Sequence, residues 1–310
     1  MKLVFCGTPQ FAVPSLQRLA AAGFDVQLVV TQPDRPQGRG MELTAPPVKV
    51  AAQRLGLPVV QPEKIKKNQE FKNTLTELRP DAIIVVGYGR IVPPWMLQLP
   101  PYGNINVHGS LLPKYRGAAP IQWAIAQGEK VTGVTTMRLD EGLDTGDILL
   151  QKEMEVHPED SSVTLAPRLA ELGADLLVET MHGLEQQKII PVAQDNSRAS
   201  LSPILKKEDG LVDFSRTAAD ICNRLRGFQP WPGAYTRLRG KNLKIIAAHP
   251  GEISTDLPVA EMKVNDGKFL VGCGANTVLE LLQVQSEGKK PISARDFIIG
   301  YRPVPGERLG

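Results

Sequence analysis

Apolar runs of strand length alternate with segments of helical periodicity through the first 190 residues. Strands that alternate with helices along a chain predict an α/β fold with a doubly wound, mostly parallel sheet. Ligands of such sheets bind outside the carboxyl ends of the strands, where the strand order reverses. The strands on which this prediction depends are expected at Lys2–Cys6, Val26–Thr31, Asp81–Val86 and Asn104–His108.

The pattern changes near residue 207. One helix is expected over Thr217–Arg226, and short alternating strands with tight turns follow it. Asn265–Asp266–Gly267, for example, is a hairpin signal between two such strands. We therefore expect two domains, residues 1–190 and residues 207–310, with a polar and aperiodic linker at residues 191–206. The second domain has the pattern of a small β-barrel.

The composition agrees with two folded domains, since the chain has 310 residues of which 42% are hydrophobic. The net charge is only +3, but residues 206–310 hold 16 Lys and Arg against 12 Asp and Glu. This local basic excess favours a polyanionic partner for the C-terminal part, although an excess of this size often serves solubility alone.

Three cysteines, Cys6, Cys222 and Cys273, are far apart in the chain and have neither disulfide nor metal-ligand spacing. This usage fits a reducing compartment. We find no cluster of metal-ligand residues, no signal-peptide pattern and no apolar run of membrane length in the sequence. The chain is therefore expected to be a cytoplasmic protein with no metal and no membrane partner.

Two polar residues, Asn106 and His108, stand at the end of an otherwise apolar strand. Side chains two residues apart on a strand point to the same face, so the two project together. They are either core residues whose polar groups are hydrogen-bonded within the protein, or part of a functional site at the strand end. The acidic, glycine-broken segment Asp140–Asp147 favours a site, because it is able to close over the strand end. An Asn, a His and an Asp together bind an oxyanion and move protons.

A dinucleotide cofactor is the main alternative for the first strand–helix–strand unit. Its turn carries one glycine, Gly7, where the dinucleotide fingerprint needs three. Pro9 and Phe11 stand where a pyrophosphate requires bare backbone. Asp34 alone falls where an acid that binds ribose belongs, so we regard this alternative as disfavoured.

Several motifs resemble those of the folate-dependent formyltransferases, and the resemblance spans nearly the whole chain. It implies a Rossmann-like catalytic domain followed by a domain that resembles an oligonucleotide-binding fold. Within the family, the chain is most similar to the enzymes that act on initiator methionyl-tRNA. The motifs are Asn106-x-His108, Ser110–Leu111–Leu112–Pro113, Arg116–Gly117–Ala118–Ala119–Pro120–Ile121–Gln122, Leu143–Asp144–Thr145–Gly146–Asp147, Thr31–Gln32–Pro33–Asp34–Arg35–Pro36 and Pro230–Trp231–Pro232.

The resemblance implies a one-carbon transferase of translation initiation. Its formyl donor is 10-formyltetrahydrofolate, and its acceptor is the α-amine of methionine on initiator methionyl-tRNA. The chain is expected to be a monomer without a metal. Formyltransferases of nucleotide sugars or of glycinamide ribonucleotide would share Asn106, His108 and Asp144 but not the segment from Thr31 together with this C-terminal barrel. A catalytically silent tRNA-binding protein would lack the intact trio, and a nicotinamide-dependent oxidoreductase would need the missing glycines.

The same resemblance assigns roles to individual residues. Asn106, His108 and Asp144 are the catalytic trio, and the division of labour among them stays open. The folate contacts are expected at Ser110, Leu111, Leu112, Pro113, Tyr88, Gly89, Arg90, Ile91, Val92 and Asp140.

Contacts with tRNA are expected in two places. One is the loop Asp34–Lys49, which in the relatives wedges against the acceptor stem and in which Met41–Glu42 replaces frequent lysines. The other is the C-terminal strand region, for which a solvated strand face is the competing interpretation. The residues expected to contact tRNA are Arg35, Arg39, Arg237, Arg239, Lys241 and Lys244.

Because Met41–Glu42 adds no net positive charge, Arg39 should carry an unusually large share of the loop's contact with tRNA. We expect Arg39→Ala to slow formylation of tRNA strongly while folate binding is unchanged. Arg39→Lys should restore only part of the rate, since lysine lacks the planar fork of arginine. A tRNA formylation rate within about twofold of wild type for Arg39→Ala would contradict this role.

Overall fold

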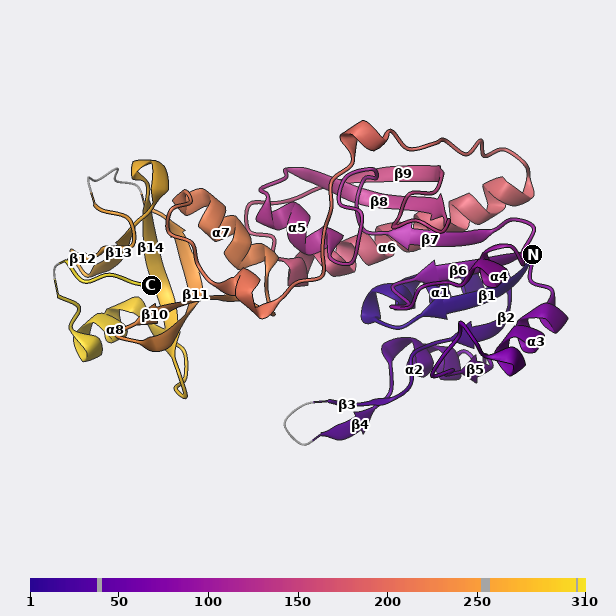
Figure 1. Cartoon of the computed structure of the whole chain (residues 1–310), viewed down its shortest axis with the longest axis horizontal. Coiled ribbons are helices and arrows are strands. Elements are labelled where there is room, and N and C mark those ends of the chain that lie inside the picture. Colours follow the sequence, from indigo (N-terminus) through magenta and orange to yellow (C-terminus); the bar gives the residue numbers. More distant parts are fainter. Residues whose placement is uncertain (38–40, 252–256, 305) are drawn as a thin grey trace. The chain divides into compact units, whose positions relative to one another are not determined.

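The computed structural model describes residues 1–37, 41–251, 257–304 and 306–310. Its packing divides the chain into two compact units (Figure 1). Unit 1 comprises Met1–Pro120, Val131–Glu155 and Ala166–Ser202, and unit 2 comprises Ile121–Lys130, Val156–Leu165 and Pro203–Gly310. The chain thus passes between the units several times. The domain bounds expected from the sequence remain a prediction.

Unit 1 is built on a seven-stranded sheet with the order β5-β2-β1-β6-β7-β8-β9. Its first five strands pair in parallel, while β8 and β9 continue the sheet in antiparallel pairing. This confirms the doubly wound, mostly parallel sheet. The strands are β1 (Lys2–Gly7), β2 (Asp25–Val30), β5 (Val59–Val60), β6 (Ala82–Val86), β7 (Asn104–His108), β8 (Val131–Arg138) and β9 (Ile148–Glu155).

Both faces of this sheet are buried, which is why its central strands read as continuous apolar runs. Val4 and Cys6 of β1 belong to one apolar cluster with Phe71 and Leu75 of α3. On β7, Val107 packs against α6, where a Cβ at Gly173 would lie 2.8 Å from Val107 Cγ1. The helices of the chain's first part are α1 (Val13–Ala21), α2 (Pro47–Arg54), α3 (Gln69–Leu78), α4 (Pro94–Leu97), α5 (Pro120–Ala126) and α6 (Ser162–Glu185), with 3-10 turns η1 (Gln10–Ala12) and η2 (Asn196–Arg198).

The segment Asp34–Lys49, which the sequence pattern predicted as a loop, contains a hairpin. Strand β3 (Arg35–Gln37) pairs antiparallel with β4 (Glu42–Thr44). Figure 1 shows this hairpin as an arm that projects from the body of unit 1. Its side chains at residues 35, 36 and 42–44 are all exposed, so the hairpin lacks the apolar alternation by which strands are found in a sequence. Arg39 lies outside the described residues.

Unit 2 contains an antiparallel sheet with the order β10-β11-β14-β13-β12, and β15 pairs with β14. Phe269 of β13 stacks on Phe297 of α8 in its core, with ring centroids 5.6 Å apart. The helix expected at Thr217–Arg226 is α7. The elements are η3 (Lys207–Gly210), α7 (Ala218–Gly227), β10 (Ala234–Leu238), β11 (Lys241–Pro250), β12 (Met262–Asn265), β13 (Lys268–Gly272), η4 (Gly274–Asn276), β14 (Val278–Ser286), β15 (Ile292–Ser293) and α8 (Ala294–Tyr301).

The C-terminal tail joins the two edges of this antiparallel sheet. Near β12, Met262 N donates to Glu307 O at 2.8 Å and Leu309 N donates to the Ala260 carbonyl at 2.9 Å. At the opposite edge, Gly310 N donates to Arg237 O of β10 at 2.9 Å. Because the tail pairs with both edges, it closes the sheet into the expected barrel and leaves neither edge open there.

Leu309 anchors this closure, since its side chain is only 3% exposed in the core of unit 2. We expect Leu309→Ala to lower the free energy of unfolding of this unit by about 2–4 kcal/mol, the usual cost of a core leucine and the cavity it leaves. Chemical denaturation followed by circular dichroism measures the change. Val304→Ala, at a tail position that is 56% exposed, is the matched control and should change little. Equal effects of the two substitutions would contradict the anchoring role.

Candidate functional site

Asn106 and His108 lie at the carboxyl end of β7 and are buried, with exposed fractions of 8% and 6%. They stand opposite Met137 and Thr135 of β8 and project from the same side of the strand. Within the described part of the chain, the Asn106 side-chain amide has no hydrogen-bond partner. The amide atoms are not among the fully buried polar atoms that lack a partner in the described residues, so they remain open to a ligand or to water. The Asn106 amide is therefore placed to donate to a bound oxygen.

The imidazole of His108 is held in one orientation. Its Nε2 lies 2.9 Å from the backbone carbonyl oxygen of Tyr115. A carbonyl oxygen only accepts, so Nε2 carries the proton and donates it there. The other nitrogen, Nδ1, faces the Oδ2 atom of Asp144 at 3.7 Å. Nδ1 is thus the ring atom that is able to take up and release a proton beside a carboxylate.

Tyr115 presents its carbonyl to His108 from a left-handed backbone conformation, with φ of 62°. This conformation is uncommon for an aromatic residue, so other contacts must fix it. Ser202 Oγ donates to the same Tyr115 carbonyl at 2.9 Å, and Tyr115 N donates to Ser200 Oγ at 2.9 Å. Both serines belong to the segment that the sequence pattern predicted as a linker.

Asp144 also has a left-handed backbone, with φ of 53°. Its Oδ2 accepts the Gly117 N–H at 2.8 Å. Gln194 Nε2 donates to the carbonyls of Asp144, at 2.9 Å, and of Gly146, at 2.7 Å. Gln194 Oε1 in turn accepts from Nε and Nη2 of the buried Arg116 at 3.0 and 2.8 Å. The Asp144 loop is therefore held against His108 from outside the loop.

The predicted folate segment Ser110, Leu111, Leu112 and Pro113 follows β7 and is fixed by β8 and β9. Thr135 Oγ1 donates to the Ser110 carbonyl at 2.7 Å and accepts the Leu112 N–H at 3.1 Å. Gln151 Nε2 donates to the Leu112 carbonyl at 2.8 Å and to Thr135 Oγ1 at 2.9 Å. These four hydrogen bonds hold the backbone of the segment on both sides of Leu111, so the segment has a defined shape.

The second predicted folate segment, Tyr88–Val92, follows β6. Tyr88 is buried and its hydroxyl has no hydrogen-bond partner in the described structure, and burial raises the pKa of that hydroxyl. Gly89 has φ of 75°, which suits a glycine. Ile91 is 91% exposed, whereas Arg90 and Val92 are partly buried. The segment thus exposes one large apolar side chain beside a turn.

Asp140 begins the loop that carries Asp144. Its carboxylate accepts from Thr145 Oγ1, at 2.8 Å to each oxygen, and from Gly142 N at 3.0 Å. The side chain is therefore occupied in shaping the loop. Contact with folate at this position remains a prediction.

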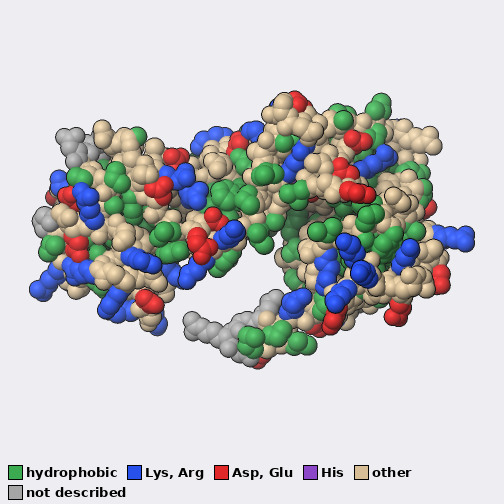
Figure 2. Space-filling model, viewed as in Figure 1, with side chains coloured by type: hydrophobic (Ala, Val, Ile, Leu, Met, Phe, Trp, Pro, Cys, Tyr) green, Lys and Arg blue, Asp and Glu red, His purple; other side chains and the backbone are tan. Residues whose placement is uncertain are grey.

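The residues predicted to contact tRNA differ in whether their side chains form ion pairs within the protein. Arg239 forms a two-point ion pair with Glu307, at 2.6 and 3.0 Å, which holds the pKa of that carboxyl below its usual range. Arg35, Arg237, Lys241 and Lys244 are exposed and make no ion pair within the described residues. Figure 2 shows Lys and Arg side chains on the surface of unit 2.

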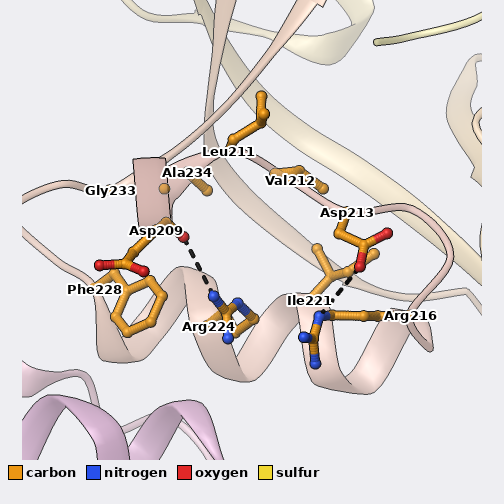
Figure 3. Close-up of a pocket in the computed structure, with 11 residues that line it drawn as sticks. Asp209, Leu211, Val212, Asp213, Arg216, Ile221, Arg224, Phe228, Gly233 and Ala234 are labelled. Atoms are coloured by element: carbon orange, nitrogen blue, oxygen red, sulfur yellow. Dashed lines mark hydrogen bonds and ion pairs between the residues drawn. The ribbon is translucent and has the colours of Figure 1, made fainter. Parts of the chain in front are cut away.

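A hollow in unit 2 is formed without any of the predicted site residues (Figure 3). Arg224 lies along it, donates to the Asp209 carbonyl at 3.4 Å and faces the Phe228 ring at 4.8 Å. Arg216 and Asp213 form an ion pair of 3.5 Å at its other end. Of these charged groups, Arg216 and Asp213 are paired with each other, whereas Arg224 is held by a backbone carbonyl and an aromatic ring. Over the described ranges, no group of three or more His, Cys, Asp or Glu has the geometry to hold a metal, and no helix is long and apolar enough to cross a membrane.

Comparison with known proteins agrees with this geometry. Residues 1–181 match the formyl transferase family, and residues 204–302 match the formyl transferase C-terminal domain. The methionyl-tRNA formyltransferase of Koribacter versatilis is 63% identical over 310 residues, which cover 100% of this chain and 99% of that one. The chain belongs to the methionyl-tRNA formyltransferase family. The corresponding protein of Acidobacterium capsulatum is 59% identical over 310 residues, which cover 100% of both chains.

Solved structures with the same fold include other formyltransferases. An N-formyltransferase from Helicobacter canadensis has a TM-score of 0.67 at 18% identity and covers 92% of this chain and 99% of its own. The phosphoribosylglycinamide formyltransferase of Bacillus halodurans has a TM-score of 0.51 at 27% identity and covers 59% of this chain and 95% of its own. The family resemblance expected from the motifs is therefore confirmed, and the chain is a one-carbon transferase by family.

The sequence pattern did not single out the residues that hold the trio in place. Gln194, Ser200 and Ser202 fall in a polar, aperiodic stretch, and nothing in their spacing indicates that they reach the Asp144 loop or Tyr115. Arg116 stands within a family motif, and a buried arginine needs acceptors. The burial of Arg116 is seen only in the structure, so the sequence itself carried no signal for these partners.

Removing the Gln194 side chain should free the Asp144 loop. We expect Gln194→Ala to lower the rate of formyl transfer about tenfold, the scale of about 1.4 kcal/mol for one or two hydrogen bonds. Steady-state kinetics on methionyl-tRNA measures the rate, and thermal unfolding checks the fold. Gln186→Ala is the control, because Gln186 is exposed and its side chain has no partner within the described residues. A wild-type rate in Gln194→Ala would show that the loop holds its position without this clamp.

Proposed function

We propose that the chain transfers the formyl group of 10-formyltetrahydrofolate to the α-amine of methionine on initiator methionyl-tRNA, in the cytoplasm. The observation that carries the proposal is the meeting of Asn106, His108 and Asp144 at the end of β7. Relatives named methionyl-tRNA formyltransferases support the choice of substrate, being up to 63% identical over the full chain. That the chain acts as a monomer remains a prediction.

The reaction joins the amine nitrogen to the formyl carbon and breaks the bond from that carbon to N10 of the folate. Attack on the formyl carbon produces a tetrahedral intermediate with a negatively charged oxygen. An aminoacyl amine has a reference pKa of about 7.7–8, so a useful fraction is neutral near pH 7 and no strong base is required. The site must stabilise the oxyanion, move one proton and position both substrates.

The geometry favours a distinct task for each member of the trio. The unpartnered Asn106 amide donates to the oxyanion. His108 has Nε2 committed to Tyr115, so Nδ1 accepts the proton released by the amine and delivers it to N10. Asp144, 3.7 Å from Nδ1, stabilises the imidazolium that exists between these two steps. Atoms balance, because the proton lost by the amine is the one that N10 gains.

The folate is proposed to lie along the ends of β6 and β7. The Ser110–Pro113 segment is held rigid by Thr135 and Gln151, which suits a contact made largely by backbone. The exposed Ile91, beside the Tyr88–Gly89 turn, supplies apolar surface. The Asp140 carboxylate holds the loop that carries Asp144, so we assign Asp140 an indirect role in folate binding.

The tRNA is proposed to contact both the β3–β4 arm and the β10–β11 strands. Arg35 and Arg39 belong to the arm, and Arg237, Lys241 and Lys244 supply exposed charge on unit 2. Arg239 has a smaller share in this proposal, because Glu307 already neutralises it. A formyl-transfer assay that compares methionyl-tRNA with free methionine tests the acceptor. Equal rates at equal concentration would contradict a tRNA substrate.

The trio is tested by Asn106→Ala and His108→Ala. Each should lower the rate of formylation by about two to three orders of magnitude. This is the range for losing one oxyanion donor, in the case of Asn106, and it lies within the range for losing one acid–base group, in the case of His108. Binding of folate, measured by titration calorimetry, should change little, because the proposed folate segments are fixed by other residues. Near wild-type turnover in either variant would refute its assignment.

A further inference from the structure

Four neighbouring strands of unit 1 are joined at their carboxyl ends by side-chain hydrogen bonds. Gln61 follows β5, and its Nε2 donates to the Gln32 carbonyl at 2.8 Å. Gln32 follows β2, and its Nε2 donates to the carbonyls of Tyr88, at 3.1 Å, and Gly89, at 3.4 Å. Thr8 follows β1, and its Oγ1 also donates to the Tyr88 carbonyl at 3.1 Å. A continuous row thus ends on the turn after β6.

The same row is attached to the base of the β3–β4 arm. Asp34 immediately precedes β3, and Lys49 lies in α2, which follows the arm. Lys49 Nζ contacts both oxygens of Asp34, at 2.9 and 2.7 Å. Gln61 Nε2 donates to Asp34 Oδ1 at 2.7 Å. Hydrogen bonds from Gln61 and Lys49 lower the pKa of Asp34, so this anchor is charged at neutral pH.

The turn at the other end of the row is anchored by the buried Tyr88 side chain, while its backbone carbonyls are held by Gln32 and Thr8. Gly87 and Gly89, on either side of Tyr88, have φ of 54° and 75°. Glycine permits many backbone conformations, so the position of such a turn depends on the groups that hold its carbonyls. A Cβ at Gly89 would lie 3.6 Å from Gln32 Nε2, which shows how closely Gln32 approaches.

We propose that Gln32 is a positioning residue that couples the arm to the Tyr88–Gly89 turn, so that tRNA and folate bind cooperatively. The inference rests on the function proposed above, in which the arm meets tRNA and the turn meets folate. A ligand that orders the arm fixes Asp34, Gln61 and then Gln32. The turn is thereby held in place for the folate. Thermodynamic linkage requires the reverse effect to have the same size.

Stability alone is a poor explanation for this row. The Asp34 and Lys49 side chains are 23% and 20% exposed, and ion pairs in contact with solvent contribute little to folding. The row also uses three side chains, Thr8, Gln32 and Gln61, each of which follows a different strand. At one edge of the sheet they bind backbone carbonyls and the Asp34 carboxylate. Coupling between two substrates explains why the links run from the arm to the turn.

The coupling is measured with ligands that cannot react together. Tetrahydrofolate carries no formyl group, so its dissociation constant is determined by titration calorimetry with and without saturating methionyl-tRNA. In the wild type, methionyl-tRNA should tighten tetrahydrofolate binding about fivefold or more, the lower end of typical coupling between sites. Tetrahydrofolate should tighten methionyl-tRNA binding by the same factor.

Gln32→Met keeps the length of the side chain and removes its hydrogen bonds. It should reduce the coupling factor to below about twofold, while the affinity for each ligand alone stays within about threefold of wild type. Lys49→Met should act in the same direction by releasing the base of the arm. Gln53→Met, at an exposed position of α2 whose side chain has no partner in the described residues, is the control for the substitution itself.

Thr8→Val separates coupling from simple support of the turn. It removes a hydrogen bond to the same Tyr88 carbonyl but breaks no link to the arm. It should keep the wild-type coupling factor even if folate binds more weakly. A wild-type coupling factor in Gln32→Met would overturn the inference, and so would a coupling factor in Thr8→Val that falls as far as in Gln32→Met. A wild-type enzyme that formylates methionyl-tRNA but has a coupling factor below twofold would overturn it as well. A wild type that does not formylate methionyl-tRNA would overturn the proposed function, and the inference with it.

Discussion

The geometry of the site depends on holding a carboxylate next to a buried imidazole. Asp144 reaches His108 from a left-handed backbone conformation, which a loop keeps only when its surroundings over-determine it. Here the constraints come from outside the loop, through Gly117 at the carboxylate and Gln194 at the backbone carbonyls. Arg116 orients Gln194, so a buried cation acts on the trio without touching it.

The order of strands explains why the chemistry gathers at this edge. From β1, the chain first adds β2 and β5 on one side, and then β6 and β7 on the other. The strand order therefore reverses beside β1 and β6, which is where ligands of doubly wound sheets bind. The turn after β6 and the polar end of β7 lie next to this reversal. Asn106 and His108 are thus polar because of their place in the sheet, while Ile105 and Val107, which alternate with them, fill the core.

The parts of the structure that a sequence predicts are those that leave a periodic signal. The buried strands, α7 and the pairing of Asn106 with His108 on one face all follow from spacing. The β3–β4 hairpin was predicted as a loop because its side chains at residues 35, 36 and 42–44 are exposed and show no apolar alternation. Gln194 and Ser202 were missed for a different reason: they act through backbone carbonyls far along the chain, and such contacts impose no pattern on the residues that make them.

A count of charges along the sequence shows where the Lys and Arg residues are. It does not show which of them form ion pairs within the folded protein. In unit 2, Arg239 is paired with Glu307, Lys268 with Glu280 and Arg216 with Asp213. These pairs neutralise charge inside the unit, so they contribute little to the field that a polyanion meets.

The exposed Lys241 and Lys244 of β11 and Arg237 of β10 lie on paired strands, with Lys244 opposite Tyr235. Three cations of the C-terminal part that make no ion pair within the described residues thus lie on one two-stranded ribbon. A phosphate backbone that lies along this ribbon meets cations and an aromatic ring together, the combination by which single strands of nucleic acid are held without regard to sequence. Under the proposed function, such a surface adds affinity for tRNA without selecting which tRNA is bound.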